Sequence, residues 1–219
     1  MKINYMFNIN KSENSHGVGK ITILSFLILF FLAITLLILN NNVFILNLDQ
    51  AVHTLITSHL SPSFYSWMLS ITNIGDILST IIIFTVFGLF LFSKNKTSFY
   101  IFTLATASGI ASTQIIKHFV QRARPINPLE QGFSFPSAHA MIATVFLLSS
   151  IYLLAPHMKK VFSKNTFLIV TAIIFPLVAF SRIYLSVHWA SDVIAGIVLG
   201  LICFVFSSFT YCYKKENVL

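Results

Sequence analysis

The stretch SRIYLSVHWASDVIAGIVLGLICFVF, residues 181–206, joins a short polar segment to a long apolar one. The apolar part continues with few interruptions to Tyr213, which is about the length of helix that crosses the hydrocarbon of a bilayer. The polar part places Arg, His and Asp directly beside that hydrocarbon, where charged side chains are costly and mark functional sites. This stretch therefore predicts a membrane-spanning helix with a site at one end.

Composition assigns the whole chain to the membrane. Hydrophobic residues make up 56% of the 219 residues and charged residues 9%, whereas about a quarter of the residues in a soluble domain are charged. Apolar segments long enough to cross a bilayer recur, with short polar loops between them. We therefore predict an all-α fold, a polytopic bundle of six transmembrane helices. The predicted spans are residues 21–39, 77–92, 99–116, 140–155, 166–180 and 193–213.

The segment after the first span is too polar to cross the membrane. Residues 46–60 mix apolar side chains with Asp49, His53 and His59. This mixture favours an amphipathic helix that lies at the membrane interface. We assign no partner and no role to His53, His59 or His118.

Polar breaks set the expected boundaries of the second span and of the domain. The apolar run 64–92 is interrupted just before Ile77, and we expect Asp76 to cap the helix that follows. We divide the chain into a cytoplasmic N-terminal segment (1–20), a six-span membrane domain (21–213) and a cytoplasmic tail (214–219).

The basic residues predict the orientation of the bundle. The net charge of +8 does not indicate nucleic acid, because most basic residues lie in loops between spans, where they orient a membrane protein. Six spans place both termini on one side, and that side holds ten of the fourteen basic residues. We therefore expect a cell-membrane protein with cytoplasmic termini. The remaining four, on the periplasmic or extracellular side, are Lys117, Arg122, Arg124 and Arg182.

Three polar runs fall together on that outer side, and the first is residues 117–125. Lys117 and Arg124 are seven residues apart, so they share a helix face if the helix continues past Lys117 until Pro125 ends it. An ammonium and a planar guanidinium suit a tetrahedral phosphate. The alternative is that Lys117, Arg122 and Arg124 extend to lipid headgroups at a helix end.

The second run is residues 136–139, Pro-Ser-Ala-His. Ser137 is placed to cap the next helix, whose first backbone N–H groups then point at an anion. His139 lies within the first turn, from where it can donate a proton to a leaving oxygen. The alternative is a helix cap beside an interfacial histidine.

The third run is residues 181–192. His188 and Asp192 are four residues apart and share one face of a helix if both lie on it. A carboxylate bound to one imidazole nitrogen leaves the other nitrogen as a nucleophile. A metal site is a weaker interpretation, because no Cys or Glu cluster accompanies the pair. A structural His-Asp pair is the other alternative.

In order and spacing these runs read Lys-x6-Arg-Pro, Pro-Ser-x-His and Ser-Arg-x5-His-x3-Asp. The chain thereby resembles the phosphatidic acid phosphatase type 2 family of integral-membrane lipid phosphatases, whose core is shared by vanadium-dependent haloperoxidases. The resemblance implies that core within the six-span bundle. The matching positions are Lys117, Arg124, Pro125, Pro136, Ser137, His139, Ser181, Arg182, His188 and Asp192.

The resemblance implies a two-step phosphoryl transfer that uses no metal and no cofactor. His188 is the expected nucleophile, Asp192 orients it, and His139 is the general acid and then the general base. The phosphate oxygens are stabilised by cations and by N–H groups at a helix end, as phosphoryl transfer requires. The expected phosphate-binding residues are Lys117, Arg124, Ser137, Ala138 and Arg182.

One position departs from the family pattern. The family usually has Gly between the Ser and His of the second motif, where this chain has Ala138. Alanine keeps the backbone N–H but disfavours positive φ and adds a methyl group. Phosphate affinity or turnover would suffer if the loop needed that conformation, and we expect activity to survive.

The expected partners are the lipid bilayer and a lipid phosphate or diphosphate, with no nucleic acid and no obligate protein partner. We favour undecaprenyl diphosphate, because outward-facing bacterial members of the family commonly recycle it. Phosphatidylglycerophosphate, phosphatidate, diacylglycerol diphosphate and lipid A phosphates are alternatives. A non-catalytic lipid-phosphate binding or transport protein is a second class, although binding alone needs no oriented nucleophile. We assign no role to Tyr184 or Trp189.

Overall fold

The computed structural model describes residues 13–59, 61–125 and 131–216, and its long elements are all helices. They are α1 (Glu13–Leu39), α2 (Val43–Thr57), α3 (Pro62–Thr72), α4 (Ile77–Lys94), α5 (Lys96–Val120), α6 (Ala138–Ser149), α7 (Val161–Tyr184) and α8 (Ala190–Glu216). A 3-10 turn at Asn73–Gly75 links α3 to α4, and α6 continues through a π-turn (Ser150–Leu154) into a 3-10 turn (Ala155–His157). The all-α prediction is confirmed.

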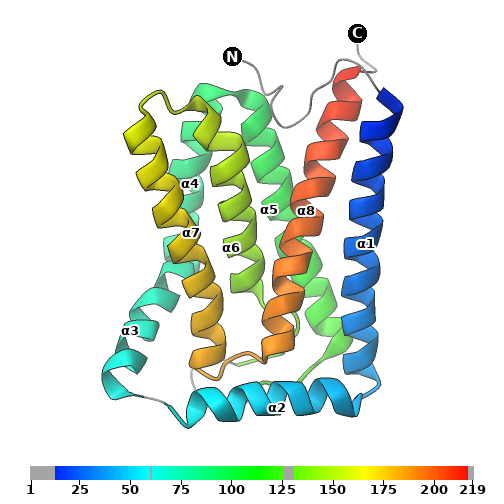
Figure 1. Cartoon of the computed structure of the whole chain (residues 1–219), viewed down its shortest axis with the longest axis vertical. Coiled ribbons are helices and arrows are strands. Elements are labelled where there is room, and N and C mark those ends of the chain that lie inside the picture. The colour runs from blue at the N-terminus through cyan, green and yellow to red at the C-terminus, as the bar shows by residue number, and fades with distance from the viewer. Residues whose placement is uncertain (1–12, 60, 126–130, 217–219) are drawn as a thin grey trace.

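Most of the long helices run side by side as a bundle (Figure 1). Within the described residues, five helices are long and apolar enough to cross a membrane, and the broken pair Pro62–Gly75 and Leu78–Lys94, bent by 52°, makes a sixth when it is counted as one span. The break lies at the polar residues that interrupt the apolar run, and Asp76 has the extended backbone (φ −67°, ψ 159°) of a helix N-cap. Its carboxylate forms no capping hydrogen bond with the described part of α4, so the expected capping role is filled by backbone geometry alone.

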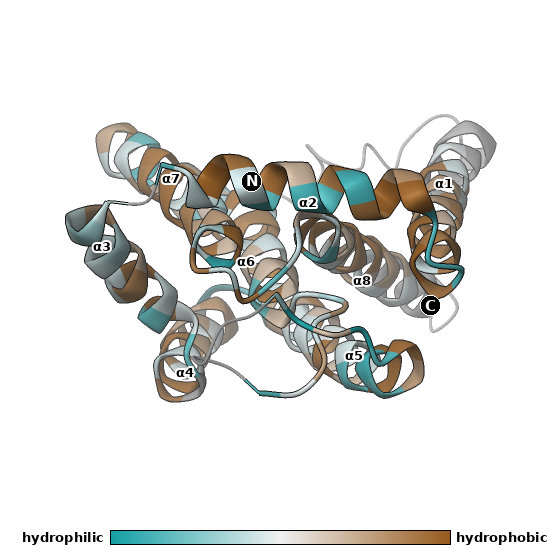
Figure 2. Ribbon diagram, turned by 90° about the horizontal axis from the view of Figure 1, so that it is seen from below, coloured by the Kyte–Doolittle hydropathy of each residue, from teal (hydrophilic) through white to brown (hydrophobic). Residues whose placement is uncertain are grey.

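Helix α2 lies across one end of the bundle, as the interfacial prediction requires (Figures 1 and 2). Asn42 caps its N-terminus by accepting a hydrogen bond from Phe44 N at 3.0 Å, so α2 begins three residues before the predicted segment 46–60. Ile45 and Asp49 face the protein, whereas Phe44 is exposed. Exposed apolar side chains such as Phe44 and Leu55 suit a helix that rests at the lipid boundary.

Helix α8 brings the N-terminus of α6 close to its own first turns. A Cβ atom on Gly196 would lie 2.4 Å from the Ser137 carbonyl oxygen, and one on Gly200 would lie 2.8 Å from the Met141 carbonyl oxygen. Small residues four apart allow two membrane helices to approach at backbone distance. This contact places the second polar run beside the third.

The described ends of the chain lie away from α2. The first turns of α1 and the last turns of α8 are at the opposite end of the bundle (Figure 1). Helix α1 begins at Glu13, inside the predicted N-terminal segment 1–20, and α8 continues to Glu216, inside the predicted tail 214–219. Residues 1–12 and 217–219 lie outside the described ranges, and the division into segments stays a prediction.

Candidate active site

The three polar runs meet at the end of the bundle covered by α2. The Ser137 N–H donates to the Asp192 carbonyl at 3.0 Å, and the Ser134 N–H donates to the Arg122 carbonyl at 2.9 Å. A guanidinium nitrogen of Arg124 lies 3.2 Å from His188 Nε2. The predicted single site is therefore assembled from three distant parts of the chain.

Lys117 and Arg124 reach the site, but not along one helix face. Helix α5 ends at Val120, because Gln121 adopts the left-handed conformation (φ 50°) and the chain then runs extended. The expectation of a helix continuing to Pro125 is wrong. Lys117 Nζ donates to the Phe133 carbonyl at 2.6 Å, and Arg124 donates to the Val187 carbonyl at 2.9 Å.

Ser137 caps α6 as predicted. Its Oγ accepts a hydrogen bond from Ala140 N at 3.4 Å, and α6 begins at Ala138. The positive-φ residues of the described chain are Asn41, Gln121, Gly132 and Ser186, and Ala138 is not among them. Alanine therefore fits the backbone here without strain, and its N–H keeps its place at the helix terminus.

His139 lies in the first turn of α6, packed against Gly75. A Cβ atom added to Gly75 would lie 2.3 Å from His139 Cδ2, so only glycine leaves room for the imidazole. His139 Nε2 is buried and makes no hydrogen bond with any residue that the structure describes. Asp76, Arg124 and Lys117 are close enough for their charges to act on this imidazole.

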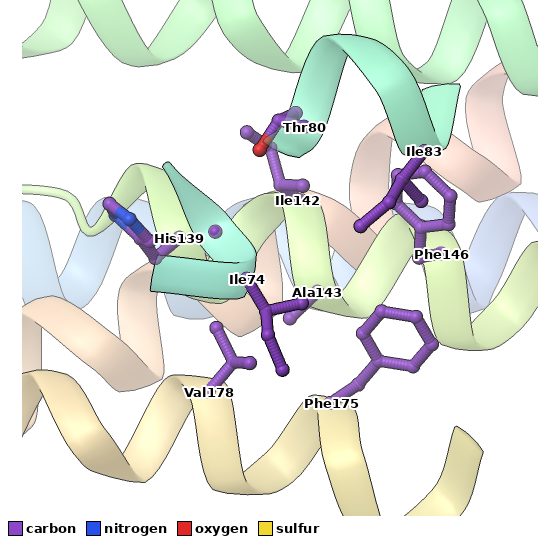
Figure 3. Close-up of a pocket in the computed structure, with 10 residues that line it drawn as sticks. Ile74, Thr80, Ile83, His139, Ile142, Ala143, Phe146, Phe175 and Val178 are labelled. Carbon is purple, nitrogen blue, oxygen red and sulfur yellow. The ribbon is translucent and has the colours of Figure 1, made fainter. Parts of the chain in front are cut away.

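An apolar hollow opens beside His139, between α4, α6 and α7. His139 lies at one end of it, and Phe146 and Phe175 lie at the other (Figure 3). Ile74, Ile83, Ile142 and Val178 line the walls. The hollow has a volume of about 20 Å³, which is room for about one water molecule, and its walls are apolar.

His188 is held by a loop and not by a helix. Ser186 has positive φ (56°), the Val187 and His188 N–H groups donate to the Arg182 carbonyl at 3.2 and 3.1 Å, and α8 begins only at Ala190. The expectation that His188 and Asp192 share a helix face is wrong. The loop nevertheless brings His188 Nδ1 to 3.5 Å from Asp192 Oδ2, an ion-pair distance longer than an ordinary hydrogen bond.

The contacts of His188 define its protonation. Arginine only donates, so the 3.2 Å contact from Arg124 assigns the lone pair to Nε2 and the proton to Nδ1, which faces Asp192. Burial lowers the pKa of His188 to about 3; Asp192 opposes the shift, and Arg124 and Lys117 add to it. The imidazole is therefore neutral at neutral pH, as a nucleophile must be.

The side chains of Arg182 and Arg124 differ in their surroundings. Arg182 is 2% exposed and donates a hydrogen bond to Thr72 Oγ1, which ties α7 to α3. Burial lowers the pKa of Arg124, and Asp192 opposes that shift. Arginine stays charged in proteins, so both side chains keep their positive charge at the site.

Sequence reasoning missed several contacts at this end. The expectation that His53 has no partner is wrong, because its Nε2 lies 3.1 Å from Ser186 Oγ and its ring lies 5.6 Å from that of Trp189. Arg122 does not extend to headgroups, since it forms ion pairs of 2.6 Å with both Asp49 and Asp192.

The other histidines make local contacts that were also not expected. His59 Nδ1 lies 2.9 Å from Ser58 Oγ, and the His118 ring packs on Phe133. Among the residues that the structure describes, no three His, Cys, Asp or Glu side chains gather as metal ligands would. The metal-free reaction stays a prediction.

The match to a known protein family covers the part of the chain that contains the three polar runs. The PAP2 superfamily matches residues 96–217. Phosphatidylglycerophosphatase B of Bacillus subtilis is 30% identical over 190 residues, 81% of this chain and 89% of that protein. An undecaprenyl-diphosphatase of Sulfolobus acidocaldarius is 27% identical over 121 residues, 51% of this chain and 54% of that protein.

A solved structure is similar over almost the whole chain. It is a transmembrane PAP2 type phosphatidylglycerolphosphate phosphatase from Bacillus subtilis, with a TM-score of 0.74 and 28% identity. The match covers 90% of this chain and 97% of that one. The similarity therefore includes α1 to α4, which precede the segment matched by the superfamily.

Proposed function

This chain belongs to the PAP2 superfamily, and we propose that it is an integral-membrane lipid phosphatase. The observation that carries the proposal is the setting of His188, a buried neutral imidazole with Nδ1 facing Asp192 and Nε2 facing Arg124. A protein that only binds a lipid phosphate does not need a nucleophile prepared in this way. The named relatives act on phosphate groups of lipids.

The first step is attack by His188 Nε2 on phosphorus. A P–N bond forms as the bond from phosphorus to the leaving oxygen breaks, and His139 gives its proton to that oxygen. The leaving oxygen is the ester oxygen of a lipid monophosphate or the bridging oxygen of a lipid diphosphate. Arg124 leaves Nε2 and binds the phosphate, because its guanidinium cannot remain on the lone pair that attacks. Asp192 stabilises the imidazole as positive charge develops on it.

The second step returns His188 to its starting state. Water attacks phosphorus and His139 accepts a proton of that water. The P–N bond breaks, its electron pair returns to His188 Nε2, and inorganic phosphate leaves. The same imidazole serves as acid and then as base, which suits a reference pKa of about 6.5.

We assign the equatorial phosphate oxygens to the cations around His188 and to the start of α6. Lys117, Arg124 and Arg182 supply positive charge, and the N–H groups after Ser137 point out of a helix N-terminus. These groups act without a metal in the proposed reaction. Treatment with EDTA is expected to leave the rate unchanged.

The apolar side chains beside His139 support a lipid as the leaving group. His139 must contact the oxygen that departs, so the group attached to that oxygen lies on the His139 side of the phosphate, where the hollow opens (Figure 3). Undecaprenyl diphosphate is our first candidate. Phosphatidylglycerophosphate is the second, because the relative that covers 81% of the chain is named for it.

The test is phosphate release by purified protein in detergent. The substrates are undecaprenyl diphosphate, phosphatidylglycerophosphate, phosphatidate and lipid A, and the control is His188→Ala. We expect release from at least one lipid and none from the variant, with both proteins equally folded. Full activity of His188→Ala would exclude His188 as the nucleophile, and release from none of the lipids would exclude the proposed function.

We place the site on the outer face of the cell membrane. The basic residues at the end of the bundle away from the site, such as Lys94 and Lys159, match the cytoplasmic bias. In a Cys203→Ser/Cys212→Ser background, Gln131→Cys should be labelled by an impermeant thiol reagent in intact cells. Lys159→Cys should be labelled only after the membrane is opened, and the reverse pattern would place the site in the cytoplasm.

A further inference from the structure

Helix α2 buries an acidic side chain against the end of the bundle. Asp49 is 2% exposed, whereas Phe44 and Leu55 on the same helix are 71% and 64% exposed. A buried carboxylate is costly unless it is paired and hydrogen-bonded. The hydrogen-bond partners of Asp49 therefore indicate which part of the site this helix supports.

Both oxygens of Asp49 are occupied. Oδ2 accepts from Arg122 at 2.6 Å and from Ser191 Oγ at 2.6 Å, and Oδ1 accepts from Ser191 N at 2.9 Å. Ser191 directly precedes Asp192 in the first turn of α8. Asp49 thus holds the backbone next to the carboxylate that faces His188.

Arg122 connects Asp49 to Asp192. One terminal nitrogen of its guanidinium donates to Asp49 and the other donates to Asp192 Oδ1, both at 2.6 Å. Asp192 Oδ2 is left to accept from Trp189 N at 2.9 Å and to face His188 Nδ1. Arg122 therefore sets the rotation of the carboxylate that orients the nucleophile.

Helix α2 also contacts the loop that carries His188. His53, one turn after Asp49, contacts Ser186 and Trp189, which lie on either side of His188 in the sequence. Trp189 Nε1 donates to the Ala123 carbonyl at 3.0 Å, and the Arg122 guanidinium lies 5.7 Å from its ring centre. One face of α2 thus holds the loop at two points.

We propose that Asp49 and Arg122 are positioning residues that hold Asp192, and through it His188, from the interfacial helix. The inference rests on the proposed function. Neither residue is assigned to the substrate, so their loss should act on the chemical step and not on substrate binding. A displacement of a reacting group by about 1 Å can lower a rate about a hundredfold.

The experiment is a double-mutant cycle on phosphate release in detergent. We expect Asp49→Asn to lower kcat by about 10- to 100-fold with KM unchanged, and to slow formation of the acid-labile phosphoenzyme in rapid-quench measurements. The same substitution should have no effect in an Asp192→Asn background. If Asp49 acts only by holding the Asp192 carboxylate, its loss cannot lower kcat further once that carboxylate is gone. An equal loss in both backgrounds, or an unchanged kcat, would overturn the proposal.

Two further variants complete the design. Gln50 is an exposed residue next to Asp49, and Gln50→Ala should leave kcat unchanged. If Gln50→Ala lowered kcat as much as Asp49→Asn does, the effect would belong to α2 as a whole and the proposal would be overturned. If Asp49→Asn does not fold, Ser191→Ala replaces it in the cycle. This variant removes the hydroxyl between Asp49 and Arg122 but keeps every charge. We then expect a fewfold loss that disappears with Asp192→Asn, and the same loss in both backgrounds would refute the proposal.

Wild-type protein and His188→Ala are measured on whichever of the four lipids the wild type hydrolyses fastest. A wild type that is inactive on all four lipids would overturn the proposed function and this inference together. An active wild type with kcat unaffected by Asp49→Asn would overturn this inference alone.

Discussion

The two histidines of the site are held in opposite ways. His188 lies in a loop, is 2% exposed, and has a charged residue facing each ring nitrogen. His139 lies in a helix, and its buried Nε2 makes no hydrogen bond within the described chain while it faces an apolar hollow (Figure 3). The difference suits the reaction that we propose, in which His188 must keep one lone pair aimed at phosphorus and His139 must keep a nitrogen for an oxygen that arrives with the substrate.

The backbone explains why the two need different support. The helix that carries His139 is capped by Ser137, so its backbone is set locally and the ring needs only the space that Gly75 leaves. The loop that carries His188 lacks the regular backbone hydrogen bonds of a helix. Hydrogen bonds from Arg124 and to the Arg182 carbonyl, together with contacts from α2, hold it in place. Fixing a loop residue thus requires a network that fixing a helical residue does not.

The largest expected effect separates the roles of the two rings. His139→Ala should lower kcat for a lipid phosphate by about 10²- to 10⁴-fold, because general acid catalysis is worth that much. The loss should be much smaller for p-nitrophenyl phosphate, whose leaving phenolate scarcely needs a proton. His188→Ala should remove activity on both substrates, and equal losses in His139→Ala would argue against the acid role.

The second test concerns the space beside His139. Gly75→Ala should lower kcat by about tenfold, because its methyl group would lie 2.3 Å from His139 Cδ2 and displace the ring. The matched control is Gly88→Ala, where the added carbon would meet Phe99 at an ordinary 3.5 Å. The measurement is the steady-state kcat of the two variants. Similar kcat values would contradict the role of Gly75 in leaving space for the His139 ring.

The third test uses the burial of His188. Its folded pKa of about 3 lies below the unfolded value of about 6.5, so between those values the unfolded chain binds a proton that the folded protein excludes. Stability is therefore full above pH 6.5 and falls with pH toward 3, by up to about 1.4 kcal/mol per pH unit. The Tm of wild type in detergent should drop more steeply over this range than that of His188→Gln, and parallel profiles would count against a buried neutral imidazole.

The smallest effect is expected at the departure from the family pattern. Ala138→Gly should change kcat/KM by less than about threefold, because the backbone of Ala138 does not have the positive φ that glycine favours. Phosphate release across a range of substrate concentrations measures the ratio. A large gain in the glycine variant would mean that the alanine methyl group hinders the phosphate.

Local chemistry made much of the molecule predictable. Apolar length predicted the spans, the mixed segment around Asp49 predicted the interfacial helix, and a Ser before an apolar run predicted the cap of α6. Neighbouring polar residues also predicted the interruption before α4, although not the 52° bend found there. Each of these features depends on residues within a few turns of one another.

The geometry within the runs was less predictable, since a spacing indicates a shared helix face only if the helix continues. Left-handed residues at Gln121 and Ser186 place Arg124 and His188 in loops, and tertiary contacts then bring them back to the site. Sequence spacing therefore selected residues that do meet in space, although for a partly wrong geometric reason.

By itself the sequence determined which three polar runs gather, and that they gather at one end of a membrane bundle. Only the tertiary structure decided that α2 takes part, because Asp49 and Arg122 are 73 residues apart and their ion pair depends on how α2 lies across the bundle. A buried charge in an apolar segment indicates that a partner exists. It does not indicate which one, since an ion pair requires proximity in space and no periodicity along the chain encodes it.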